Sequence, residues 1–213
     1  FLINMDYAHG HQIQNITRRL LAQKNPDIEI VGDVLHPIGK VKDFSPYIAQ
    51  IRASGADSVI TGNWGNDLAL LVRAAADAGL EAKFYTYYGG GLGGPKSIGA
   101  AGEGRLFQIT EYHRNLPLEL GKLEVYDFVL PFDEANGDVN WYYGRIGTMM
   151  DMLKLAAEKA GSTDPVAIAY ALEDLEMETP FGKVIMRGID HQLLQPLFIS
   201  GFTKDVKYDA ENS

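Results

Sequence analysis

Three short segments carry the side chains best suited to holding a small molecule. They are Asp6-Tyr7-Ala8-His9, Asn63-Trp64-Gly65-Asn66 and Tyr87-Tyr88-Gly89, and each follows an apolar run. Aromatic rings offer large rigid contact faces, while hydroxyl, imidazole and amide groups add directional hydrogen bonds. Turns that serve structure alone rarely carry rings in all three places, so the pattern favours a ligand pocket. The predicted ligand-contact residues are Tyr7, His9, Asn63, Trp64, Tyr87 and Tyr88.

A glycine run offers a competing chemistry, nucleotide binding. Gly89, Gly91 and Gly94 fit the spacing G-x-G-x-x-G, and Lys96-Ser97 suggest a P-loop. A P-loop needs the lysine directly after the last glycine, but Pro95 stands between Gly94 and Lys96. A dinucleotide fingerprint also needs a long helix directly afterwards, to aim its N-terminus at the pyrophosphate. The following residues are too few and too rich in Gly and Ala, so we interpret the run as a flexible wall of a cleft. A doubly wound enzyme using this loop for a nucleotide remains the lesser alternative.

The residues of catalysis and metal binding do not assemble into a motif. His9 and His11 could supply two metal ligands, but their side chains diverge at a strand-to-helix turn and no carboxylate cluster completes the shell. No G-x-S-x-G elbow, no spaced acid pair and no cysteine is present. The sequence therefore predicts a binding protein without catalytic, metal or cofactor sites.

Composition narrows the class of partner. The chain has 213 residues, 46% hydrophobic and 22% charged, which is a globular composition. Its net charge of −9 repels phosphate backbones, so nucleic acid is not expected as a partner. No apolar run reaches the ~20 residues of a membrane helix. The chain opens on Phe1-Leu2-Ile3 without a signal segment, so we expect a fragment of a longer protein.

The elements that must position these segments alternate between strand and helix. Apolar periodicity and stop signals predict the strands Phe1–Met5, Ile28–Leu35, Asp57–Thr61 and Lys83–Tyr88. Helices are predicted at His11–Lys24 and Asn66–Ala78, and a further one starts after Asp43, with Ser45 as its cap and Pro46 at the first helical position. This order predicts an α/β fold, a doubly wound parallel sheet with helices on both faces. Ligands of such sheets bind outside the carboxyl ends of the strands, where the three segments lie.

The second half of the chain has a different predicted order of helices and strands. After a strand at Arg105–Tyr112, it predicts helices at Leu118–Leu130, Asp138–Ala160 and Pro165–Leu175, then strands at Phe181–Arg187 and Gln195–Phe202. Helices without strands between them suggest a second domain whose sheet comes from elsewhere. Trp141-Tyr142-Tyr143 falls near the start of a long helix, where ligand contact and aromatic packing are equally favoured; Tyr142 joins the predicted ligand contacts.

Several blocks in a specific order carry a family resemblance. They are Asp6-Tyr7-Ala8-His9-Gly10, Lys42-Asp43-Phe44-Ser45-Pro46, Ile51-Arg52-Ala53-Ser54-Gly55-Ala56-Asp57, Arg73-Ala74-Ala75-Ala76-Asp77-Ala78-Gly79-Leu80 and Thr179-Pro180-Phe181-Gly182-Lys183-Val184. Across nearly its whole length the chain resembles type I periplasmic solute-binding proteins of the leucine/isoleucine/valine-binding branch. The resemblance implies a two-lobed protein. Residues 1–108 and 181–213 would form the C-terminal lobe and 113–178 the helical remainder of the N-terminal lobe, whose first part would lie upstream.

The function that the resemblance implies is solute uptake. The protein would be the periplasmic, extracytoplasmic component of an ABC transporter, binding a small organic solute in an interlobe cleft and delivering it to a membrane permease. The alternative is a ligand-sensing regulatory or receptor module of the same fold. Helices in 113–178 would expose apolar faces, so self-association or domain swapping is expected.

The resemblance also bears on the ligand. Tyr7, Trp64, Tyr88 and Tyr142 match pocket positions of the family, but its amino-acid binders place an acidic residue where this chain has Tyr88. An unpaired ammonium group in a dry cleft costs several kcal/mol. We therefore expect a ligand without a free α-ammonium group, an aromatic or aliphatic carboxylate or an amide, stacked between Trp64 and Tyr7. Asp67 or Glu111 would be the alternative source of an acid.

Overall fold

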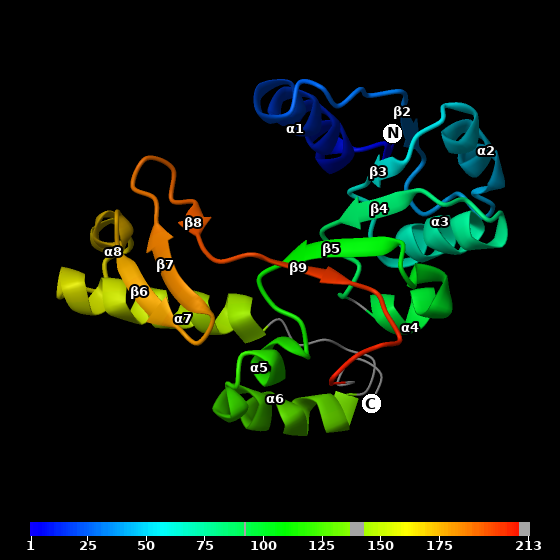
Figure 1. Ribbon diagram of the computed structural model, residues 1–213. Helices are drawn as coiled ribbons and strands as arrows, with labels where there is room; N and C mark the ends of the chain where they lie inside the picture. The colour runs from blue at the N-terminus through cyan, green and yellow to red at the C-terminus, as the bar shows by residue number, and fades with distance from the viewer. Residues whose placement is uncertain (92, 137–142, 209–213) are drawn as a thin grey trace. The chain divides into compact units, whose positions relative to one another are not determined.

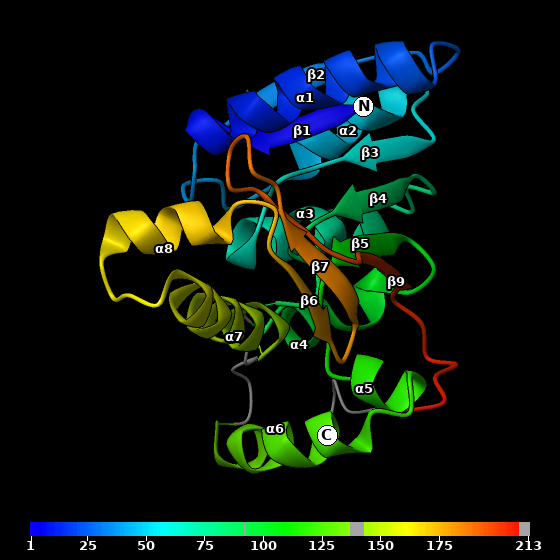
Figure 2. The ribbon, with the colours of Figure 1, turned by 90° about the vertical axis from the view of Figure 1, so that its left-hand side faces the viewer.

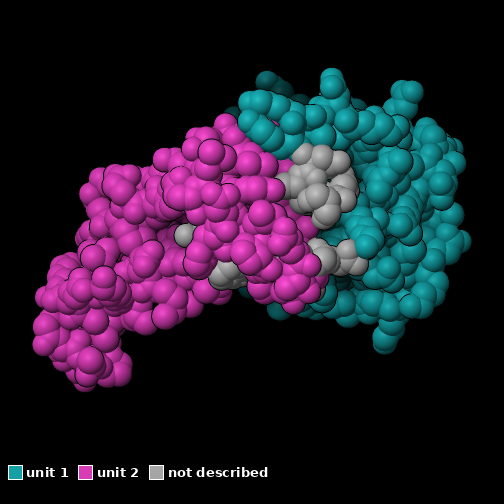
Figure 3. All heavy atoms as spheres, turned by 90° about the horizontal axis from the view of Figure 1, so that it is seen from below, with its two compact units in different colours: residues 1–110, 199–213 teal, residues 111–198 magenta. Residues whose placement is uncertain are grey.

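The computed structural model describes residues 1–91, 93–136 and 143–208. The chain divides into two compact units, Phe1–Thr110 with Ile199–Ser213 (unit 1) and Glu111–Phe198 (unit 2), coloured separately in Figure 3. This division keeps residues 181–198 with unit 2, and the assignment of lobes stays a prediction. Among the helices described, none combines the length and apolar character needed to cross a membrane.

Unit 1 is built on a six-stranded sheet. The strands, in spatial order, are β2 (Asp33–His36), β1 (Leu2–Met5), β3 (Ser58–Ile60), β4 (Lys83–Thr86), β5 (Leu106–Thr110) and β9 (Phe198–Gly201). The four pairings from β2 to β5 are parallel. The edge strand β9 runs opposite to β5 (Figure 1). The predicted parallel α/β sheet is confirmed.

Helices cover both faces of this sheet, as the doubly wound fold requires. They are α1 (Ala8–Lys24), α2 (Ser45–Ala53), α3 (Gly65–Asp77) and the short α4 (Gly94–Ile98), followed by a 3-10 turn, η1 (Gly99–Gly102). Figure 1 shows α1 on one face and α2, α3 and α4 on the other.

The main core lies between the sheet and the helices α2, α3 and α4. Each of four strands contributes one fully buried side chain to it: Ile3, Val59, Phe84 and Leu106. Because side chains alternate between the two faces of a strand, these residues share one face. They pack against apolar residues of the helices, chiefly Phe44, Ile48, Ile51, Leu68, Leu71, Val72 and Ile98. Burial of this apolar surface, worth about 25 cal/mol per Å², fixes the strand ends in register.

Several elements of unit 1 differ in their bounds from the prediction, among them β4, which ends at Thr86 instead of Tyr88. Helix α1 begins at Ala8 instead of His11. Strand β2 begins at Asp33 instead of Ile28, because its register with β1 starts with Asp33 opposite Leu2, the first residue of β1. Ser45 is not the cap of α2, because the helix has Phe44 at its N-cap and no side-chain cap bond. The side chain of Asp43 accepts from the Ser45 N–H at 2.8 Å, which satisfies the first N–H of the helix. Pro46, predicted at the first helical position, is the second residue of α2, after Ser45.

Unit 2 combines helices with a small sheet. Its elements are α5 (Leu116–Glu119), α6 (Leu123–Asn136), α7 (Tyr143–Ala160), α8 (Pro165–Leu172), β6 (Glu176–Thr179), β7 (Gly182–Met186) and β8 (Leu193–Leu194). The three strands form an antiparallel sheet in the order β6-β7-β8. The predicted helix up to Leu175 is too long: α8 ends at Leu172, because Glu173 has a non-helical backbone (ψ 124°) and Asp174 is left-handed (φ 53°).

Candidate functional site

The carboxyl ends of β1, β3 and β4 lie side by side at one edge of the sheet in unit 1. These strands are neighbours in the order β1-β3-β4, and in Figure 2 their arrowheads point the same way. Tyr7 follows β1, Trp64 follows β3 and Tyr88 follows β4. The parallel topology therefore brings together three segments that are up to about eighty residues apart in the sequence.

Their aromatic side chains form a connected group, which we call the aromatic cluster: Tyr7, His9, Trp64, Tyr87 and Tyr88. The Trp64 indole N–H donates to the Tyr7 hydroxyl at 3.0 Å. The ring centroids of Tyr7 and His9 lie 5.8 Å apart, those of His9 and Tyr88 6.0 Å, and those of Tyr88 and Tyr87 6.4 Å. Trp64 and Tyr87 remain 38% and 44% exposed. The cluster is thus accessible and offers both ring faces and polar edges.

The hydrogen bond between Tyr7 and Trp64 constrains how a ligand ring would meet them. The indole nitrogen and the phenol oxygen are in direct contact, so the two side chains are joined at their polar edges. No gap separates the two polar edges in this structure, and a ligand ring stacked between Trp64 and Tyr7 stays a prediction.

Asn63 lies beneath this layer. Its side chain is fully buried, and its amide nitrogen lies 2.8 Å from Nε2 of the equally buried His36. The partner of Asn63, His36 at the end of β2, was not singled out from the sequence. The pairing crosses over the end of β1, because β1 stands between β2 and β3 in the sheet. Tyr142 lies outside the described residues.

Position 62, beneath the aromatic cluster, has no room for a side chain and therefore needs glycine. Its N–H donates to Oδ1 of the buried Asn4 at 2.7 Å. A Cβ atom at this position would come within 2.9 Å of Ile13, 3.2 Å of Asn4 Oδ1 and 3.3 Å of His9 Nε2. The backbone of β3 can approach α1 this closely only because residue 62 has no side chain.

The carboxylates considered as partners for a ligand ammonium group, and Asp6 beside Tyr7, all have protein partners. Asp67, at 4% exposure, accepts from the Gly39 N–H at 2.8 Å. Asp6 lies 2.9 Å from His11 Nε2, with both side chains exposed. In unit 2, Glu111 accepts from the guanidinium group of Arg145 at 2.6 to 2.7 Å. Asp67 and Glu111, the alternative acids for a ligand ammonium group, both have protein partners.

The glycine run leads into a helix of five residues, α4. Gly94 fits there because a Cβ atom would lie 2.3 Å from the carbonyl oxygen of Gly89. The Gly90 N–H donates to the side chain of Gln108. These contacts give Gly90 and Gly94 a packing role. Among the described residues, no group of three or more His, Asp or Glu side chains is arranged to hold a metal ion.

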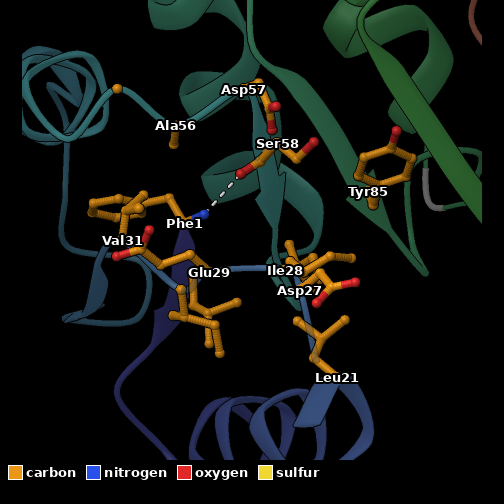
Figure 4. Close-up of a pocket in the computed structure, with 14 residues that line it drawn as sticks. Phe1, Leu21, Asp27, Ile28, Glu29, Val31, Ala56, Asp57, Ser58 and Tyr85 are labelled. Carbon is orange, nitrogen blue, oxygen red and sulfur yellow. Dashed lines mark hydrogen bonds between the residues drawn. The ribbon is translucent and has the colours of Figure 1, made fainter. Parts of the chain in front are cut away.

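A hollow of about 590 Å³ lies elsewhere in unit 1 (Figure 4). It is lined by residues at the starts of strands, including Phe1, Leu2 and Ser58. The amino group of Phe1 donates to the Ser58 carbonyl at 2.8 Å in its wall. None of the aromatic-cluster residues lines this hollow, which belongs to the opposite ends of the strands.

Comparison with known proteins identifies the family of this chain. A family model described as "Periplasmic binding protein" matches residues 1–206. The chain is 33% identical to Leu/Ile/Val-binding protein homolog 4 of Brucella melitensis, over 100% of this chain and 51% of that protein. It therefore spans about half the length of these relatives.

Solved structures show the same relationship. A leucine-, isoleucine-, valine-, threonine- and alanine-binding protein of Brucella ovis superposes with a TM-score of 0.83 and 31% identity, over 98% of this chain and 53% of that one. An ABC-transporter solute-binding protein of Rhodopseudomonas palustris, in complex with p-hydroxybenzoic acid, superposes with a TM-score of 0.77 and 21% identity, over 94% and 55%. The resemblance seen in the sequence is thus confirmed, and the chain belongs to the periplasmic binding protein family, with Leu/Ile/Val-binding proteins among its relatives.

Proposed function

We propose that this protein is the extracytoplasmic solute-binding component of an ABC uptake transporter. It binds a small organic solute reversibly at the aromatic cluster, in the cleft that this family closes around its ligand, and delivers it to a membrane permease. The relatives named above are solute-binding proteins, and none is an enzyme. The observation that carries the proposal is the aromatic cluster itself, because it offers contact faces and polar edges at the carboxyl ends of parallel strands.

We further propose that the solute is an organic acid or amide, preferably aromatic, without a free α-ammonium group. Tyr88 offers a phenol where an acid would be needed, and Asp67 is buried against Gly39. A ligand ammonium group would thus lose its hydration without gaining a carboxylate partner, at a cost of several kcal/mol. Proteins of this fold hold 4-hydroxybenzoate, benzoate and 3,4-dihydroxybenzoate as well as amino acids.

The test is a thermal-shift screen, confirmed by calorimetry, with leucine, valine, benzoate and 4-hydroxybenzoate. We expect stabilisation by the aromatic acids. Strong stabilisation by leucine or valine would reject the ligand class. A matched pair of variants sharpens the result: Tyr88→Glu supplies the missing acid, while Tyr88→Phe keeps the ring. Tyr88→Glu should gain affinity for amino acids and lose it for the aromatic acids, and Tyr88→Phe should gain none for amino acids.

Unit 2 supports a separate proposal, self-association. On α7, Met149, Met150 and Leu153 are 53%, 55% and 44% exposed, although they lie close together on the helix. Exposed apolar groups of this kind favour association. Light scattering should show a concentration-dependent rise in mass, which Met149→Lys should reduce. A monomer at all concentrations would contradict this proposal.

A further inference from the structure

A buried polar layer lies directly beneath the aromatic cluster. His36 and Asn63 are both fully buried, and their side chains meet at 2.8 Å between His36 Nε2 and Asn63 Nδ2. The other ring nitrogen of His36, Nδ1, lies 3.3 Å from the carbonyl oxygen of Pro37. A carbonyl oxygen can only accept, so a hydrogen bond at this position requires the tautomer with its proton on Nδ1. In the neutral ring, Nε2 then accepts from the Asn63 amide.

The ring of His36 is held in place by its neighbours. It meets Phe44 edge-on, with centroids 5.0 Å apart at 85°, and Tyr47 at 5.8 Å and 62°. Its backbone carbonyl accepts from the N–H of Asp6 at 2.7 Å. His36 therefore bonds to the ends of two other strands, to β1 through its carbonyl and to the segment after β3 through its ring.

These two bonds flank the residues that touch the ligand in the proposed function. Asp6 directly precedes Tyr7, and Asn63 directly precedes Trp64. Tyr7 and Trp64 are in turn bonded to each other at 3.0 Å. His36 thus completes a closed ring of hydrogen bonds. It holds the residue before Tyr7 and the residue before Trp64, and Tyr7 and Trp64 hold each other.

A second hydrogen bond joins the same two segments. Asp67, in the first turn of α3, accepts from the N–H of Gly39 at 2.8 Å. Gly39 lies three residues after His36 and has φ of +66°, a conformation that glycine adopts without strain. The segment His36–Gly39 is therefore tied to the Trp64 segment at both of its ends.

We propose that His36, with Asp67, is a positioning residue of the ligand site, which holds Trp64 in place against Tyr7 through buried hydrogen bonds without itself touching the ligand. The inference rests on the proposed function only in taking Trp64 as a ligand contact. Among the described residues, Asn63 Oδ1 is buried without a hydrogen-bond partner, so the bond to His36 Nε2 is the side-chain bond that holds this amide. Removal of the acceptor at Nε2 leaves both ends of the buried amide unpaired, and the added desolvation cost favours displacement of the Asn63 segment. Trp64, the next residue, moves with it.

The test compares His36→Leu with His36→Gln, two side chains of similar volume of which only glutamine can accept from Asn63. Both are made with Trp141→Phe, so that Trp64 is the only tryptophan of the chain. Acrylamide quenching of Trp64 is measured well below the melting temperature and without ligand. We expect stronger quenching in His36→Leu and near-parental quenching in His36→Gln. With 4-hydroxybenzoate, the Kd should rise about tenfold for His36→Leu and much less for His36→Gln.

Equal quenching in His36→Leu, His36→Gln and the parent would overturn the proposal, even if both variants melt at a lower temperature. If His36→Leu fails to fold, a comparison of Asp67→Leu with Asp67→Asn tests the hydrogen bond from Gly39 in the same way.

Nitrogen NMR of the histidines in the parent protein gives a further check, with the His36 signal assigned by its loss in His36→Gln. A His36 protonated at Nε2 instead of Nδ1 would refute the arrangement. If no solute binds, the proposed function is wrong. The positioning role of His36 is then still decided by the quenching of Trp64 measured without ligand.

Discussion

Gly10 provides the sharpest test of how α1 is seated at the end of β1. It lies in the first turn of the helix and is buried. A Cβ atom added there would stand 1.9 Å from the carbonyl oxygen of Met5 and 3.3 Å from the Cβ of Asn4. Since real Cβ atoms essentially never come closer than 3.0 Å to another heavy atom, Gly10→Ala forces helix and strand apart by about 1 Å.

Two opposing effects set the magnitude. Alanine is the better helix former, by about 1 kcal/mol in a helix interior. Overpacking of a tight interior costs about 1–3 kcal/mol, and the upper part of that range applies because the obstacle is backbone and cannot rotate away. We therefore expect Gly10→Ala to lower the free energy of unfolding by about 1–2 kcal/mol, with the sign opposite to that of helix propensity.

The assay is urea unfolding followed by circular dichroism, with a matched pair at the exposed position 12. There, Gln12→Ala should be more stable than Gln12→Gly by about 1 kcal/mol, which measures propensity alone in the same helix. At position 10 the order of alanine and glycine should reverse. If Gly10→Ala were as stable as the parent or more so, the close approach of α1 to β1 would be wrong.

Three further changes test other parts of the molecule. Asp164→Ala removes the cap that accepts from the Ala167 N–H at 2.9 Å, so α8 should lose about 1 kcal/mol, seen as a lower urea midpoint. Burial lowers the pKa of His113, against a smaller opposing effect of the Glu119 carboxylate. The folded protein then binds fewer protons than the unfolded one, so stability should fall as pH drops below about 6.5, and His113→Gln should flatten that dependence in melts across pH. Phe84→Ala, in the core of unit 1, should cost about 3–5 kcal/mol by urea unfolding; a loss below about 1 kcal/mol would contradict its burial.

The sheet of unit 1 was predictable because its strands obey simple patterns. Apolar residues such as Val59 and Phe84 sit in short runs with helices between them, and that alternation fixes a parallel sheet. Once the strands are parallel, the residues after them share one edge. Tyr7, Trp64 and Tyr88 could therefore be placed together without knowledge of any distance.

Other features depend on information that a local pattern does not hold. The start of β2 depends on the register between Asp33 and Leu2, which only the paired strand determines. Strand β6, with the sequence Glu-Met-Glu-Thr, alternates too briefly to be distinguished from the end of a helix. Its existence depends on pairing with β7, in which Met177 lies opposite Val184.

The buried layer under the aromatic cluster shows the limit most clearly. His36 and Asn63 are 27 positions apart, on segments separated in the sheet by β1. Burial of either side chain alone would be unfavourable, so neither residue type signals a buried role until its partner is known. The sequence therefore predicted Asn63 as a ligand contact and passed over His36.

The two layers should have separable effects on binding. Substitutions in the exposed layer change which groups face the ligand, so Tyr88→Glu should alter which solutes bind. Substitutions in the buried layer leave those groups unchanged and alter their placement, so His36→Leu should weaken all solutes that contact Trp64 by a similar factor. Selectivity measured across a panel of solutes thus separates the two roles. A His36→Leu variant that exchanged one preferred solute for another would show that the layers are not distinct.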